Sequence, residues 1–218
     1  MSKSSRVLFG LLLPVSALVA CATSPGNDDL EEGLEGDRNP APLGSPPAPN
    51  ADASLLAQIE FSAPGYNGTG CPQGTGAVAL SADHQTLSVT APAAFNATTV
   101  GSIVDRRKIC QASVAFTPKA GIRLGIASIK LTGSATLAGS GAGRVTLEKR
   151  FPFGADDVTT VSVASSGPLS LESDVGVTWS ECGASSIAIA SAALVASGTS
   201  ADLKGAGFTA TLVAERCQ

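Results

Sequence analysis

The chain has 218 residues, of which 44% are hydrophobic and only 4% aromatic, and its formal net charge at pH 7 is −4. This length supports one well-buried domain, and the low aromatic content predicts a core of small aliphatic side chains. Residues 22–54 carry seven acidic residues against one arginine, whereas residues 55–218 carry eleven residues of each sign. A neutral domain lacks the basic surface that binds phosphate backbones, which excludes nucleic acid as a partner.

Residues 1–20 are predicted to be a lipoprotein signal peptide. The basic start MSKSSR precedes the apolar run 7–20, which is too short to span a bilayer as a mature helix. Leu18-Val19-Ala20-Cys21 resembles the lipobox of bacterial lipoproteins, which predicts Cys21 as the site of lipid attachment. The protein is then exported and held on the membrane of the bacterial cell envelope by its lipid. If the bacterium is diderm, Ala22 after the cysteine resembles an outer-membrane sorting signal. The alternative to the lipobox is an ordinary secretory signal.

Residues 21–54 are predicted to be the lipidated cysteine followed by a disordered, acidic and proline-rich tether. Six prolines stand among small and acidic residues between positions 25 and 49. Such a composition cannot bury enough apolar surface to offset chain entropy. A tether of this length reaches on the order of 30 Å as a flexible coil and about 100 Å when extended.

Residues 55–218 are predicted to form an all-β domain. Short runs alternate between apolar and polar residues, as in 110–116, where Cys110, Ala112, Val114 and Phe116 share one face. About nine or ten such strands, separated by turn residues, predict an antiparallel β-sandwich with a jelly-roll-like arrangement and disulfide staples. Between 122 and 137 the apolar residues change phase, which predicts a β-bulge at Ala127-Ser128.

The cysteines favour structural bridges over a metal site. Four remain when Cys21 is set aside, an even number in an exported chain, which predicts two disulfides. Of the three connectivities we favour Cys71 with Cys110 and Cys182 with Cys217, because each closes a loop of moderate length. No Cys-x-x-Cys pair is present and the single histidine lies in a predicted turn, so we expect no metal and no cofactor.

A succession of short motifs resembles the secreted family called domain of unknown function 4360. These motifs are GCPQGT at 70–75, DRRKIC at 105–110, FTPKAG at 116–121, Gly167-Pro168 and WSECG at 179–183. The resemblance implies export and a β-rich domain of this size, and it brings no known activity and no catalytic residues. This chain departs from the family pattern at Glu181, where a proline is frequent, and in its lipobox and long tether.

Two hypotheses for function follow. The first is a non-enzymatic surface module that binds an envelope protein or a glycan, or that has a structural role, with Asp105, Arg106, Trp179 and Glu181 as candidate ligand contacts. For Trp179 the alternative is a core ring packed on a disulfide. For Arg106 and its basic neighbours the alternative is a solvated start of a strand.

The second hypothesis is a small secreted, glycan-directed hydrolase that uses two carboxylates. We identify no catalytic residue, because the candidates are five acids without a motif: Asp105, Asp156, Asp157, Glu172 and Glu181. An enzyme of this kind requires two acids that converge in a concave pocket, whereas a binding module does not.

Overall fold

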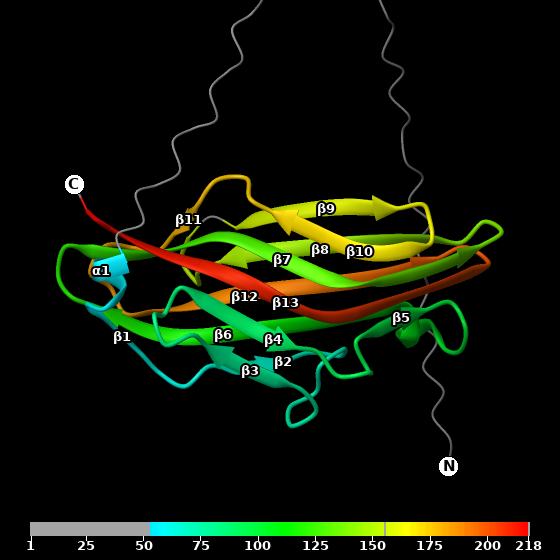
Figure 1. Ribbon diagram of the computed structural model, residues 1–218, viewed down its shortest axis with the longest axis horizontal. Helices are drawn as coiled ribbons and strands as arrows, with labels where there is room; N and C mark the ends of the chain where they lie inside the picture. The colour runs from blue at the N-terminus through cyan, green and yellow to red at the C-terminus, as the bar shows by residue number, and fades with distance from the viewer. Residues whose placement is uncertain (1–52, 155, 218) are drawn as a thin grey trace, which may run out of the picture. The chain divides into compact units, whose positions relative to one another are not determined.

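The protein is described by a computed structural model that covers residues 53–154 and 156–217. In this part of the chain, antiparallel strands form two facing sheets, a β-sandwich as predicted (Figure 1). The six-stranded sheet has the order β1-β6-β12-β8-β9, with β2 also paired to β6. The seven-stranded sheet has the order β10-β7-β13-β4-β3, with β11 also paired to β7 and β5 to β13.

Four long strands run the length of the domain, and shorter strands flank them. Nine strands have four residues or more, in line with the nine or ten predicted, and four have two or three. In chain order the elements are α1 (Ala53–Leu56), β1 (Ile59–Phe61), β2 (Gly65–Asn67), β3 (Ala77–Leu80), β4 (Thr86–Thr90), β5 (Asn96–Thr98), the 3₁₀ helix η1 (Ile103–Arg106), β6 (Arg107–Pro118), β7 (Ile122–Ala138), β8 (Ala142–Arg150), β9 (Asp157–Val163), β10 (Gly167–Ser173), β11 (Thr178–Trp179), β12 (Ser186–Ser197) and β13 (Ser200–Arg216).

The core lies between the two sheets and is built mainly from alanine, valine, isoleucine and leucine, as the composition predicts. In β6 the predicted alternation holds, because Cys110, Ala112, Val114 and Phe116 are all buried. Small side chains let the sheets approach closely, and buried phenylalanines such as Phe95 fill the larger gaps.

The predicted β-bulge is confirmed. Along the pairing of β13 with β7, Thr211 is opposite Ser128 but the next residue, Leu212, is opposite Ile126. Ala127 is therefore the extra residue, and it restores the inward orientation of the apolar side chains on either side. A second shift lies in β13 between Gly205 and Gly207, which the sequence did not predict.

Both favoured disulfides are confirmed. Cys71 is bonded to Cys110 and Cys182 to Cys217, and the partners are separated by 39 and 35 positions in the sequence. The first bridge attaches the loop after β2 to the long strand β6 and is fully buried, whereas Cys182 is exposed. The glycine-rich segment around Cys71 is thus a covalent attachment of a loop to a sheet.

The predicted signal peptide, Cys21 and the tether lie outside the described residues, apart from the last positions of the tether. Among the helices that the structure describes, none has the length and apolar character needed to cross a bilayer.

Candidate functional site

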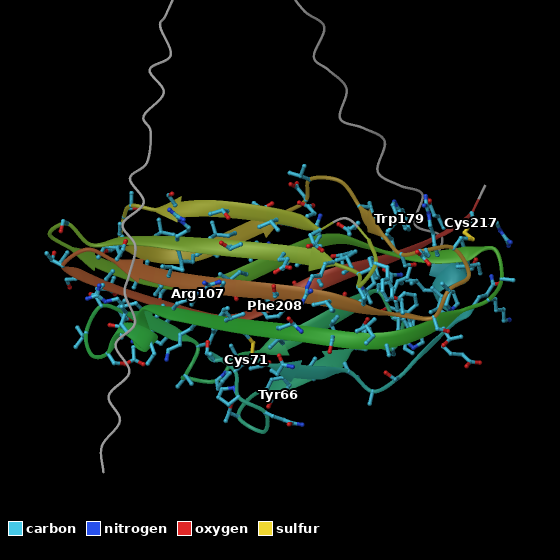
Figure 2. All side chains as sticks on the ribbon, turned by 180° about the vertical axis from the view of Figure 1, so that it is seen from behind. Tyr66, Cys71, Arg107, Trp179, Phe208 and Cys217 are labelled. Atoms are coloured by element: carbon cyan, nitrogen blue, oxygen red, sulfur yellow. A yellow bond between two sulfur atoms is a disulfide. The ribbon has the colours of Figure 1, made fainter. Side chains whose placement is uncertain are left out.

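The four candidate ligand contacts lie in two separate groups. Asp105 and Arg106 belong to η1, directly before the start of β6. Trp179 in β11 pairs with Gly125 near the start of β7, which follows the other end of β6, and Glu181 comes two positions after Trp179. The twelve residues of β6 place these two groups about 35 Å apart. Figure 2 shows the same separation, with Trp179 and Cys217 at one end of the domain and Arg107 toward the other. The four residues therefore cannot contact one small ligand.

Asp105 has a local structural role. Its carboxylate accepts hydrogen bonds from the Ser102 hydroxyl at 2.8 Å and the Ser102 backbone N–H at 3.2 Å, and Lys108 Nζ lies 3.0 Å away. These hydrogen bonds, that of the Ser102 hydroxyl above all, lower the pKa of Asp105 to about 2. A carboxyl group that stays ionised to this pH cannot donate a proton as a general acid near neutrality.

Trp179 is not a core ring, so the interpretation that it packs within the core on a disulfide is wrong. Its ring is half-buried and lies on Gly125, where a Cβ would come within 2.6 Å of the ring. The guanidinium carbon of Arg123 is 4.9 Å from the ring centroid, and Arg123 also pairs with Glu215. Glycine at 125 leaves the space that the indole fills, and the ring covers the backbone of β7 there.

Of the five candidate carboxylates, only the adjacent Asp156 and Asp157 share a hollow, and Asp157 there is held in an ion pair. Asp156 and Asp157 line one hollow of about 640 Å³ beside Trp179, and Glu181 lines a separate cavity of about 20 Å³ next to Phe153. Asp157 is already engaged by the Lys149 ammonium at 2.7 Å. Glu172 lies on β10 opposite Lys130. Among the described residues, no three histidine, cysteine or acidic side chains are placed to hold a metal ion.

Lys149 is a feature that the sequence analysis missed. Its side chain is fully buried and projects from β8 toward the facing sheet. Nζ donates to the backbone oxygens of Ala127 at 3.2 Å, Val175 at 3.3 Å and Gly176 at 3.0 Å, in addition to its ion pair with Asp157. The bulge at Ala127 thus supplies one of the oxygens that hold the ammonium. The signal was present in the sequence, because Lys149 is in phase with the inward residues Val145 and Leu147.

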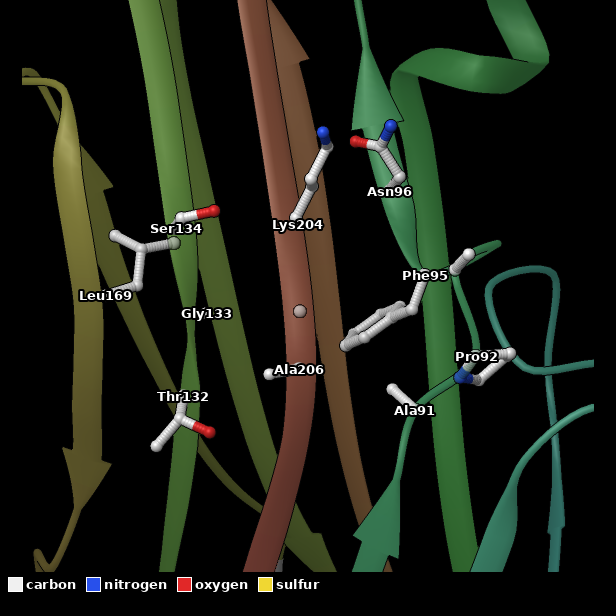
Figure 3. A pocket seen from close by; sticks show the side chains of 12 residues that line it. Ala91, Pro92, Phe95, Asn96, Thr132, Gly133, Ser134, Leu169, Lys204 and Ala206 are labelled. Carbon is white, nitrogen blue, oxygen red and sulfur yellow. The ribbon is translucent and has the colours of Figure 1, made fainter.

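An open groove of about 730 Å³ crosses β10, β7, β13 and the connection from β4 to β5 (Figure 3). Two facing glycines form its floor, since Gly133 and Gly205 are paired across β7 and β13. Glycine is required at both positions. A Cβ on Gly133 would come within 2.1 Å of the Lys204 carbonyl oxygen, and one on Gly205 within 2.2 Å of the Phe95 ring.

Four polar side chains line this groove, and they come from three strands: Asn96, Thr132, Ser134 and Lys204. Asn96 Nδ2 donates to Asp202 at 3.4 Å, whereas its Oδ1 is covered and has no hydrogen-bond partner among the described residues. The hydroxyls of Thr132 and Ser134 are exposed and make no hydrogen bond within the described part of the chain. Hydrogen-bonding capacity is therefore free in the groove, whereas Asp157 and Trp179 in the other hollow are already engaged.

Apolar surface lies beside these polar groups in the groove. Leu169 lies on one side, Ala206 in the centre and Pro92 on the other side (Figure 3). No carboxylate lines the groove as far as the described residues extend. The groove can therefore hold a ligand through hydrogen bonds and a flat apolar contact, and it offers no pair of acids for hydrolysis.

The fold and the groove define this protein as a disulfide-bonded antiparallel β-sandwich with an open, polar-lined surface site. Residues 57–214 match the family described as Domain of unknown function (DUF4360), and the chain belongs to this family. No curated protein matches the chain. Among solved structures, that of TmCBM61 in complex with β-1,4-galactotriose is similar over 72% of this chain and 91% of that chain, with 14% identity and a TM-score of 0.29.

Proposed function

We propose that this protein is an exported, lipid-anchored envelope protein whose β-sandwich binds a glycan in the groove between β10 and β5 without chemical conversion. The observation that carries the proposal is the group of exposed hydrogen-bonding side chains, Thr132, Ser134 and Lys204, that lies beside apolar surface in that groove. The Thr132 and Ser134 hydroxyls and the Lys204 ammonium belong to exposed side chains that ligand hydroxyls can reach, and each such hydrogen bond contributes about 0.5–1.5 kcal/mol.

A saccharide fits this set of groups better than a peptide or a small anion does. Sugar hydroxyls act as donor and acceptor together, and the groove offers a donor in Lys204 and hydroxyls that do both in Thr132 and Ser134. The C–H face of a pyranose ring would lie on the apolar surface of Leu169 and Ala206. Because the groove is open at its surface, an extended polymer can pass along it.

The groove is tested by affinity electrophoresis through gels that contain a β-1,4-galactan, a β-1,3-glucan, a galactomannan, a xylan or an α-1,4-glucan. We expect at least one polymer to retard the protein. The double variant Ser134→Val/Lys204→Ala is expected to weaken binding about tenfold or more, because it removes one neutral and one charged hydrogen bond. Both side chains are exposed, so the fold is retained.

A matched control has the same two kinds of change away from the groove, Ser162→Val on β9 and Lys119→Ala in the turn before β7. Both of these side chains are also exposed. The control is expected to migrate as the wild type does. Equal retardation of both double variants would show that the groove is not the binding site, and no retardation by any polymer would reject a glycan ligand.

Support for export comes from the two disulfides, which persist in oxidising compartments. Metabolic labelling with a radioactive fatty acid in a bacterial host tests the anchor. We expect the wild type and the variant Cys182→Ala/Cys217→Ala to carry the label and Cys21→Ser to lose it. A wild-type chain without label would contradict the anchor and favour an ordinary secretory signal.

A further inference from the structure

The segment 100–104, which comprises the loop after β5 and the start of η1 and is called here the loop at 100–104, exposes three large aliphatic side chains within five residues. Val100 is 76% exposed, Ile103 81% and Val104 70%. Such side chains are normally buried, and a cluster of them at one tip of a domain marks a surface that contacts another apolar phase. Figure 1 shows β5 and this loop at the end of the domain opposite α1.

The loop is held in a defined shape that keeps these side chains outward. Val100 N–H donates to the Thr98 hydroxyl at 3.1 Å, and the Asp105 backbone N–H donates to the Ser102 carbonyl at 3.0 Å. Ser102 and Asp105 also form the reciprocal cap of η1. The apolar side chains are thus presented by a braced turn, and they cannot turn inward without breaking these hydrogen bonds.

Uncompensated positive charge surrounds the same tip. Asp105 is neutralised by Lys108 at 3.0 Å, which leaves Arg106 and Arg107 exposed and without an acidic partner in the described part of the chain. Arg144 on β8 is also exposed. Strand β12 lies between β6 and β8, and its residue Val195 is opposite Arg107 on one side and Arg144 on the other. Two strand spacings separate these two arginines, about 10 Å.

Two other exposed aliphatic residues, Val175 and Val158, lack this basic surrounding. Val175 is 71% exposed and follows Asp174 in the chain, and Val158 is 55% exposed and lies two positions after Asp156, whereas Asp157 between them is paired with Lys149. Negative charge beside an apolar group opposes contact with an anionic surface, whereas arginine favours it. Charge therefore distinguishes the loop at 100–104 from the apolar positions at the opposite end.

We propose that Val100, Ile103 and Val104 insert into the interface of an anionic lipid bilayer while Arg106, Arg107 and Arg144 contact the headgroups. Amphipathic surface elements of this type insert about 5–10 Å, to the boundary between headgroups and acyl chains. The proposed lipid anchor would hold the domain near that surface but is not required for the contact itself.

A tryptophan placed in the loop tests this contact in the full chain. We replace the single native tryptophan by Trp179→Phe and introduce Ile103→Trp, or Val175→Trp as the matched control at the acidic end. Vesicles of phosphatidylcholine and phosphatidylglycerol in equal parts are added, with and without brominated acyl chains. Both variants carry the same N-terminus, which brings both to the vesicles equally.

We expect the emission of the residue-103 tryptophan to move to shorter wavelength and to be quenched by the brominated lipid, with a smaller effect for pure phosphatidylcholine or at high salt. The residue-175 tryptophan is expected to remain unshifted. An equal response of both positions overturns the proposal. No response at position 103 also overturns it, and this is the result expected if the partner is an acidic protein. If Trp179→Phe impairs folding, Ile103→Trp and Val175→Trp are made with Trp179 retained, and the emission of the wild type is subtracted from that of each variant. The result does not depend on the groove, whose failure is detected separately by electrophoresis.

Discussion

Replacing Lys149 by methionine is expected to lower the free energy of unfolding by about 3–5 kcal/mol, because it leaves a carboxylate and three backbone oxygens without their shared cation. The side chain is fully buried and joins β8 of one sheet to the bulge of β7 in the other. Methionine has a similar volume, so the loss measures the missing charge more than a cavity. Urea denaturation followed by Trp179 fluorescence reports it.

Two further variants make this prediction specific. Lys204→Met removes an exposed ammonium and is expected to change stability by no more than about 0.5 kcal/mol. The double variant Lys149→Met/Asp157→Val is expected to recover part of the loss of Lys149→Met, because it also removes the unpaired carboxylate. Stability of Lys149→Met within about 1 kcal/mol of the wild type would contradict the buried contacts we describe.

Removal of the buried disulfide is expected to cost more than removal of the exposed one. The bridges close loops of 39 and 35 residues, so the chain-entropy contribution is about 4 kcal/mol for each. Cys71→Ala/Cys110→Ala also removes two fully buried sulfur atoms and leaves a cavity, which adds about 1–2 kcal/mol. Cys182→Ala/Cys217→Ala lacks this second contribution, because Cys182 is exposed.

Because the two loops are nearly equal in length, each double variant is the control for the other. Chemical denaturation of both, beside the wild type with and without reductant, gives the difference directly. A larger loss from the exposed bridge would show that burial of Cys71 and Cys110 does not govern their contribution.

The sandwich could be predicted from the sequence because each strand has a regular alternation of apolar and polar residues, and because the residues that end each strand lie next to it in the chain. The alternation around Cys110 to Phe116 needed only the two-residue period of a strand, and the bulge at Ala127 followed from a change of phase within one strand. The disulfide pairing came from loop lengths alone. The family assignment came from the order of short motifs, and the match over residues 57–214 confirms it.

The groove could not be predicted, because its residues come from strands that are distant in the chain. Asn96 and Lys204 are 108 positions apart and become neighbours only through the pairing of β5 with β13. In the sequence, Gly133 and Gly205 likewise resemble glycines that end a strand, and only the fold shows that they are paired with each other. The sequence instead singled out Asp105 and Trp179 for their residue types, and the fold separates them by most of the length of β6.

Lys149 was overlooked for a different physical reason. A lysine in a strand is usually solvated, because burying its ammonium is costly without several oxygen ligands. Here the bulge and the connection from β10 to β11 supply those oxygens, and neither can be located from the residues near position 149.

The most direct test of the proposed function is a nuclear magnetic resonance titration of the domain with an oligosaccharide of whichever polymer retards it most strongly. We expect shift changes to centre on the backbone amides of Asn96, Gly133, Ser134 and Gly205, with the Trp179 indole signal unchanged. Changes centred on Trp179 and Asp157 would contradict the groove as the binding site and place the ligand in the hollow at the other end of the domain.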